Sequence, residues 1–106
     1  MSDQVQASHI LLMYKGSAHS SATRSKEEAA SQIAELKTRI EGGADFAEIA
    51  RETSDCPSGA QGGDLGTFGR GQMVPEFETA TFAMEVGELS DVVETDFGYH
   101  LIQRTG

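Results

Sequence analysis

Residues 55–77, DCPSGAQGGDLGTFGRGQMVPEF, contain the chain's one cysteine, both of its prolines and six of its twelve glycines. Glycine has no side chain to bury and loses the most conformational entropy on ordering, so this stretch cannot form a core by itself. Four large apolar side chains are spaced between the glycines: Leu65, Phe68, Met73 and Phe77. The stretch therefore predicts a sharply folded backbone that gathers these side chains into a pocket, with the Cys56 thiol at its rim.

The N-terminal side of the chain predicts a buried strand over residues 5–14, VQASHILLMY. Successive strand residues point to opposite faces, and here both faces carry apolar side chains, as in a central strand covered on both sides. His9 then lies among apolar neighbours. Two interpretations are open for it: a core histidine that bonds a backbone group, or a functional histidine that faces a site.

A helix is predicted to follow the polar loop of residues 15–24. Ser25 and Glu28 match the capping box S-x-x-E, which satisfies two free backbone donors at a helix start. Apolar residues then recur at helical spacing as far as Ile40, and the pair at 42–43, Gly-Gly, is typical of a helix end.

The remaining pattern alternates short helices with short strands. Residues 45–53 predict a helix capped by Asp45 with Glu48, and residues 65–68 a strand. Pro75 suits the first turn of a helix over 75–84, because its missing N–H would be unpaired there anyway. Residues 91–95 and 99–104 predict two strands joined by a turn. Strands and helices in this order indicate an α+β fold with a small, mainly antiparallel sheet.

Length and composition set limits on function. The 106 residues suffice for one domain, 1–106, in which we expect residues 1–4 to be a tail. Eight basic and seventeen acidic residues give a net charge of −9, which disfavours nucleic acid and anionic lipid as partners. The sequence has no apolar run long enough for a membrane span and no signal-peptide pattern. With a single cysteine, this predicts a cytoplasmic protein.

Three kinds of chemistry fit the residues poorly. The glycines of 59–66 lack the Lys-Ser/Thr of a phosphate-binding loop. The possible metal ligands His9, His19, His100 and Cys56 match no zinc spacing, so no metal site is predicted. The context of Cys56, SDCPSGA, resembles neither common cysteine-protease signature.

Rotation of an X–Pro peptide bond fits better, because no bond breaks and no cofactor is needed. The barrier is about 18–20 kcal/mol, and unaided rotation takes tens to hundreds of seconds. A suitable site holds the proline ring in an apolar pocket, keeps water from the carbonyl and favours the twisted amide. Composition makes such a site plausible but does not identify it.

Four motifs together carry a family resemblance from about residue 5 to residue 104. They are ASHILL, SKEEA, the long run DFAEIARETSDCPSGAQGGDLGTFGRGQMVPEFE, and FGYHLI. Their identity and order resemble the parvulins, a family of peptidyl-prolyl cis/trans isomerases. The resemblance implies a four-stranded antiparallel sheet surrounded by three to four helices, no cofactor, and proline-containing peptides and proteins as substrates.

The resemblance also assigns site residues. The family's paired histidines fall on His9 and His100, its active-site cysteine (aspartate in some members) on Cys56, and its threonine on Thr95. With these polar positions matched, a functional role for His9 outweighs a merely structural one. The resemblance places substrate binding on the following residues: Leu65, Phe68, Gln72, Met73 and Phe77.

The chain departs from the Pin-type branch, whose members require a phosphorylated residue before proline and carry a basic cluster after the first strand. Here that loop offers Lys15 at its start and Arg24 at its end. We therefore expect a phosphate-independent monomeric isomerase that assists protein folding or conformational switching. Two alternatives are a parvulin-fold module that holds peptides, as in chaperones, without catalysis, and a thiol enzyme or redox sensor that uses Cys56.

Overall fold

The computed structural model describes residues 4–17 and 22–106. The elements are, in chain order, β1 (Gln4–Leu12), α1 (Lys26–Glu41), α2 (Phe46–Thr53), a 3-10 helix (Pro57–Gln61), β2 (Asp64–Gly69), α3 (Pro75–Ala83), β3 (Val93–Thr95) and β4 (Gly98–Arg104). The 3-10 helix was not predicted. Gln4 was expected in the N-terminal tail, but it is the first residue of β1, paired with Gly69.

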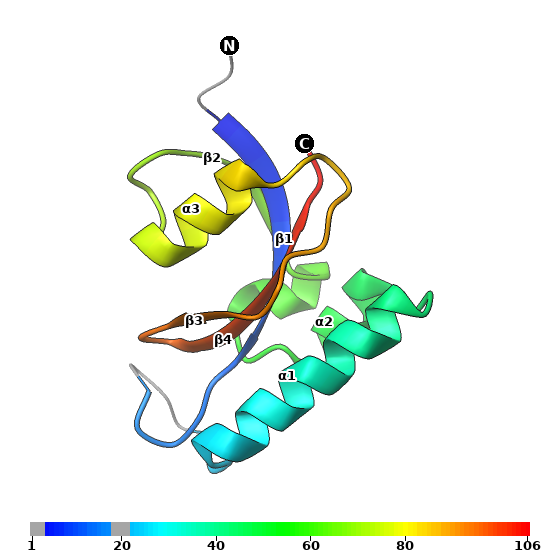
Figure 1. Ribbon diagram of the computed structural model, residues 1–106, viewed down its shortest axis with the longest axis vertical. Coiled ribbons are helices and arrows are strands. Elements are labelled where there is room, and N and C mark those ends of the chain that lie inside the picture. The colour runs from blue at the N-terminus through cyan, green and yellow to red at the C-terminus, as the bar shows by residue number, and fades with distance from the viewer. Residues whose placement is uncertain (1–3, 18–21) are drawn as a thin grey trace.

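The four strands form one sheet in the order β2-β1-β4-β3, and every neighbouring pair is antiparallel. The predicted α+β class is confirmed. Helices α1 and α2 lie on one side of the sheet and α3 on the other (Figure 1). No helix in the described part of the chain is long and apolar enough to cross a membrane.

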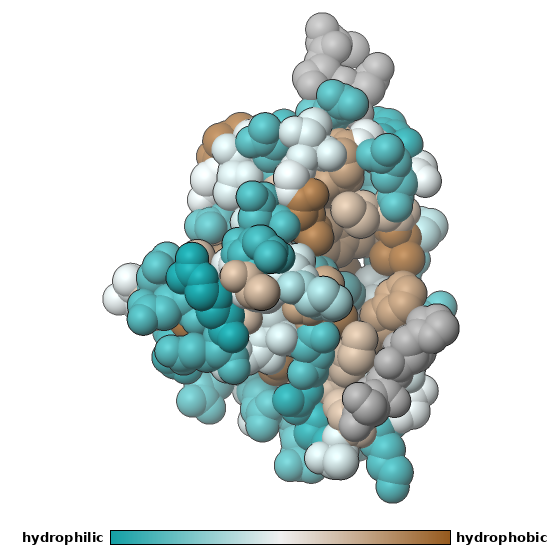
Figure 2. All heavy atoms as spheres, turned by 180° about the vertical axis from the view of Figure 1, so that it is seen from behind, coloured by the Kyte–Doolittle hydropathy of each residue, from teal (hydrophilic) through white to brown (hydrophobic). Residues whose placement is uncertain are grey.

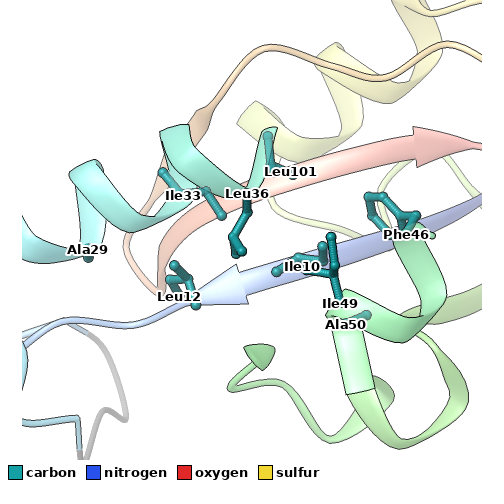
Figure 3. Packing of buried hydrophobic residues seen from close by; sticks show 9 residues of the cluster. All are labelled: Ile10, Leu12, Ala29, Ile33, Leu36, Phe46, Ile49, Ala50 and Leu101. Atoms are coloured by element: carbon teal, nitrogen blue, oxygen red, sulfur yellow. The ribbon is translucent and has the colours of Figure 1, made fainter. Parts of the chain in front are cut away.

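The alternating faces of β1 produce two separate cores. Ile10 and Leu12 of β1, with Leu101 of β4, pack under Ile33 and Leu36 of α1, as Figure 3 shows. In the same cluster, α2 contributes Phe46, Ile49 and Ala50. These side chains are buried at the spacings that the sequence pattern predicts for an inward helix face.

The second core lies under α3, on the opposite face. Its buried members are Val5, Ala7, Phe68, Phe77, Met84 and Ile102. Because β1 and β4 are covered on both faces, their side chains at odd and even positions enter different cores. The prediction of a central strand at β1 is confirmed.

Helix ends show one correct and one wrong prediction. At α1 the capping box is present: the Ser25 hydroxyl accepts from the Glu28 N–H, and the Glu28 carboxylate accepts from the Ser25 N–H. At α2 the Asp45 side chain makes no cap hydrogen bond. Burial of the apolar face of α2 holds that helix in place without the cap.

A β-bulge in β2 changes which side chains of the glycine-rich stretch share a face. Gln6 pairs with Thr67 but Ser8 pairs with Asp64, so Leu65 and Gly66 together oppose Ala7. Gly66 has φ +69°, a left-handed conformation that glycine adopts without strain. The bulge places Leu65 on the α3 face of the sheet, together with Phe68.

Candidate functional site

Three polar side chains meet on the α3 face of the sheet, and all three are buried. His9 of β1 pairs with Ile102, and His100 of β4 pairs with Leu11, so the two histidines are diagonal neighbours on one face. Their Nδ1 atoms are 3.2 Å apart. Thr95 of β3 places its Oγ1 2.7 Å from Nε2 of His100.

Both histidines are neutral at physiological pH. Burial lowers the pKa of His9 from 6.5 to about 4. Burial, and secondly the neighbouring His9, lower the pKa of His100 from 6.5 to about 3. The cause is the cost of moving a cationic imidazole out of water, here beside a second imidazole.

The hydrogen bonds of the three residues allow two proton arrangements. If the Thr95 hydroxyl donates to His100 Nε2, then His100 Nδ1 donates to His9 Nδ1, and the His9 proton is on Nε2. If each bond is reversed, His9 Nε2 carries no proton. In either case each ring has one proton, and His9 Nε2 has no hydrogen-bond partner among the residues described. The two arrangements therefore differ in whether this atom is a donor or an acceptor.

An apolar cavity of about 450 Å³ lies over the histidines. Its walls come from β1 and the residue after it, β2, β4, the 3-10 helix with the residue before it, α3 with the loop before it, and the β3–β4 turn. The lining residues are His9, Leu11, Met13, Cys56, Pro57, Leu65, Gln72, Met73, Val74, Phe77, Phe97 and His100. Phe77 packs edge-on against both imidazoles, with centroid separations of 5.4 and 5.5 Å. In the view from behind, hydrophobic side chains gather around a hollow in the right half of the molecule (Figure 2).

Hydrogen bonds connect the loop that carries Gln72 and Met73 to β2 and to α3. The Gly69 N–H donates to Gln72 Oε1 at 2.6 Å, and the Gly71 N–H donates to the Glu78 carboxylate of α3. The Arg70 guanidinium lies 4.2 Å from the ring centroid of Phe82, a cation–π contact. These contacts hold one wall of the cavity against α3.

Cys56 reaches the cavity from a segment that pairs with the free edge of β1. Beyond Ser8, no strand of the described residues pairs with that edge of β1, and the His9 N–H donates instead to Gly63 O at 2.9 Å. The Leu11 N–H donates to Ser54 Oγ at 3.1 Å, and the Asp55 N–H donates to Leu11 O at 2.7 Å. Cys56 follows directly, and its Sγ accepts from the Ser58 hydroxyl at 3.2 Å.

The predicted site residues fall into two groups: those that line the cavity and those that are buried behind it. His9, Cys56 and His100, with Leu65, Gln72, Met73 and Phe77, line the cavity. Thr95 is only 4% exposed and reaches the cavity through His100, so it is a positioning residue. Phe68 was expected in the substrate pocket, but it does not line the cavity and packs behind Phe77 in the core, because it lies opposite Val5, far from His9.

Sequence reasoning missed five cavity residues: Leu11, Met13, Pro57, Val74 and Phe97. Strand periodicity had placed Leu11 and Met13 on the face of His9, which was a usable signal. Phe97 lies in the β3–β4 turn and carried no comparable signal. His19 lies outside the described residues. Within residues 4–17 and 22–106, no three His, Cys, Asp or Glu side chains are grouped so that they could hold a metal ion.

Comparisons with known proteins agree on one family. The model of the PPIC-type PPIase domain matches residues 1–106. The peptidyl-prolyl cis-trans isomerase Pin1 of Arabidopsis thaliana is 46% identical, over 97% of this chain and 96% of its own. The foldase protein PrsA of a Geobacillus strain is 45% identical over 96% of this chain and 32% of its own.

Solved structures show the same relationship. The peptidyl-prolyl isomerase ESS1 from Candida albicans superposes with a TM-score of 0.91 at 38% identity, covering 98% of this chain and 63% of that one.

We expect both histidines to stay neutral in the folded protein as the pH falls, and the free energy of unfolding to decrease as a consequence. The unfolded chain takes up protons near pH 6.5, whereas the folded histidines do so only near 4 and 3. Their contribution to the free energy of unfolding is therefore complete above pH 6.5 and is lost as pH falls from there toward 4 and 3. Between pH 7 and 5 the loss amounts to about 2 kcal/mol per histidine.

Long-range ¹H–¹⁵N NMR spectra of the assigned imidazoles, with urea unfolding at pH 7 and pH 5, measure both effects. Neutral-imidazole shifts of His9 and His100 down to pH 5 are expected. A midpoint near pH 6.5 for either ring would contradict the assignment.

Proposed function

The chain belongs to the PPIC-type family of peptidyl-prolyl cis/trans isomerases and is an enzyme of that class, and from this premise we propose how its site works. The proline ring enters the apolar cavity between Leu65, Met73 and Phe77. The X–Pro carbonyl and nitrogen then lie over the neutral His9–His100 pair and beside Cys56. Rotation proceeds without a covalent intermediate.

One observation carries this proposal: an apolar cavity whose floor is polar but uncharged. Water stabilises the dipolar planar amide, so a dry cavity lowers the barrier to the twisted form. A polar group that can donate or accept at the floor favours the twisted amide, whose nitrogen becomes a better acceptor. A thousandfold acceleration needs only about 4 kcal/mol of differential stabilisation.

The hydrogen bonds favour a non-covalent role for Cys56. A thiol nucleophile is activated by an adjacent base within hydrogen-bond reach. Here the Nδ1 atoms of His9 and His100 bond each other, and His100 Nε2 bonds Thr95. The remaining ring nitrogen, His9 Nε2, makes no hydrogen bond to the Cys56 sulfur. The described partner of the Cys56 sulfur is the Ser58 hydroxyl, which is no base.

We propose that the enzyme does not depend on phosphorylated substrates. Phosphate recognition needs clustered, geometrically fixed cations. Arg24 is paired with Asp55, and Lys26 Nζ lies 3.0 Å from the Glu94 carboxylate and 5.8 Å from the Tyr14 ring centroid. Lys15 is exposed. Two of the three cations near the 15–24 loop are thus already neutralised by carboxylates.

The setting we propose is the cytoplasm, where the protein acts as a monomer on folding or switching of client proteins. The single free cysteine fits a reducing compartment.

The first test is catalytic efficiency on matched peptides, Ser-Pro, Glu-Pro and phosphoserine-Pro, by a protease-coupled or NMR-exchange assay at low and moderate salt. We expect isomerisation of Ser-Pro well above background and no large preference for phosphoserine-Pro. Peptide binding without a rate above background would leave a peptide-holding module. A phosphopeptide preference above about a hundredfold, or roughly 2.7 kcal/mol, would overturn phosphate independence.

The cavity is tested by Met73→Ala, with Met84→Ala as the matched control. Met73 lines the cavity, whereas Met84 is buried in the same core cluster away from it. We expect Met73→Ala to lower kcat/KM about tenfold, or about 1.4 kcal/mol, with a small loss of stability. Met84→Ala should lower the free energy of unfolding by about 2–5 kcal/mol but spare the activity of folded molecules. If activity follows the folded fraction in both variants, the cavity is not the site.

The role of Cys56 is tested by Cys56→Asp. A side chain that supplies only polarity can be replaced by another polar group of similar size, so the folded variant should keep more than about a tenth of the wild-type rate, a loss under about 1.4 kcal/mol. Covalent catalysis of rotation, in which the thiolate adds to the X–Pro carbonyl and leaves again with the C–N bond intact, predicts near-complete loss. A thiol hydrolase, which breaks the C–N bond, predicts in addition an acyl adduct on the wild-type thiol. Assay of the variant and mass spectrometry of the wild type under turnover decide among these roles.

A further inference from the structure

A second hollow adjoins the apolar cavity and shares Met13 with it. It has a volume of about 320 Å³ and is lined by Met13, Ala22, Thr23, Arg24 and Asp55. An extended peptide advances about 3.3–3.6 Å per residue. A peptide with its proline in the cavity that continues over Met13 therefore brings a residue close to the proline into this hollow.

The hollow contains one cation, held in place by one carboxylate. The Arg24 Nη1 donates to Asp55 Oδ2 at 2.5 Å and to Met13 O at 2.8 Å. The Met13 N–H donates to the same carboxylate oxygen at 2.9 Å. The Arg24 and Asp55 side chains are only 25% and 29% exposed, so solvent screens this pair less than an open surface pair.

Guanidinium groups recognise phosphate and carboxylate through fixed, paired N–H donors, and Arg24 is placed where it could serve a substrate in that way. The Asp55 carboxylate accepts one of these donors and neutralises the charge of Arg24. Any anionic side chain that enters the hollow meets a negative carboxylate beside the guanidinium, and must share Arg24 with it.

We propose that Asp55 is a specificity-determining residue, an internal counter-ion that holds Arg24 and so disfavours peptides with an anionic residue beside the proline. The inference rests on the proposed function, since it concerns substrate choice at the same site. It identifies the residue responsible for phosphate independence and implies that a single charge change would reverse this preference.

The test variant is Asp55→Asn. An asparagine carbonyl can still accept from the Met13 N–H and from Arg24, but it carries no charge. The measured quantity is the ratio of kcat/KM on phosphoserine or glutamate peptides to kcat/KM on the matching serine and glutamine peptides. The anion is placed before the proline in one series and after it in another. A ratio cancels any general loss of activity that movement of Met13 causes.

We expect Asp55→Asn to raise the phosphoserine-to-serine ratio at least tenfold in one of the two series, and the glutamate ratio about threefold. Both gains should shrink as salt is raised, because they are electrostatic. Arg24→Gln leaves Asp55 without its cation, and it should lower both ratios below those of the wild type. This second variant tests the idea even if Asp55→Asn folds poorly.

Glu52→Gln is the matched control, because it removes one negative charge from α2 in the neighbouring groove that Arg24 and Asp55 also line. Its ratios should stay at the wild-type values. An equal rise in this control would assign the effect to net charge and overturn the proposal. A rise that persists in the double variant Arg24→Gln/Asp55→Asn would overturn it as well.

A failure of the proposed function can be distinguished from a failure of the role proposed for Asp55. A wild-type protein inactive on every peptide would contradict the proposed function itself. An active wild type whose ratios do not change in Asp55→Asn would leave the function standing and refute only the role of Asp55.

Discussion

The free edge of β1 imposes the constraint on which the site depends. Beyond Ser8 this strand keeps β4 on one side, while none of the strands in residues 4–17 and 22–106 pairs with its other side, and buried backbone donors and acceptors there must still be paired. Gly63, Ser54 and Asp55 supply those partners. A Cβ on Gly63, whose φ is +83°, would collide with the His9 carbonyl, so the close approach requires glycine. The pairing fixes Cys56 beside the cavity.

The pairing of β1 with β4 on its other edge explains why the floor of the cavity is polar yet uncharged. Because β1 and β4 pair in register, His9 and His100 can satisfy each other, and Thr95 satisfies the second ring. Two neutral imidazoles can hydrogen-bond each other without either ring becoming a cation. Burial under Phe77 makes a cationic imidazole energetically costly. The wall that excludes water is therefore also the cause of the low histidine pKa values. Phe77 serves the core and the cavity at once, so the two functions cannot be separated at that residue.

Sequence reasoning succeeded where a period or a local motif was decisive. The two-residue period of β1, the capping box at Ser25 and the position of Pro75 all depend on neighbours in the chain. It failed at Phe68, because Phe68 pairs with Val5, four residues before His9 along β1, and so does not reach the cavity; Leu65, which the bulge places on the same face, lies nearer to His9 and does. The pairing of Arg24 with Asp55 joins residues far apart in sequence and followed from no local pattern.

Two cationic side chains lie at the margin of this site, and each is paired with a carboxylate. The chain has a net charge of −9, and an unpaired cation close to the cavity would attract anionic peptides from solution. Arg24 and Lys26 are each held by a carboxylate from another segment, and both ion pairs lie where the 15–24 loop meets α1. Amide rotation needs only a few kcal/mol of differential stabilisation, about 4 for a thousandfold. A dry cavity with neutral hydrogen-bonding groups supplies interactions of that size without a charged catalytic group.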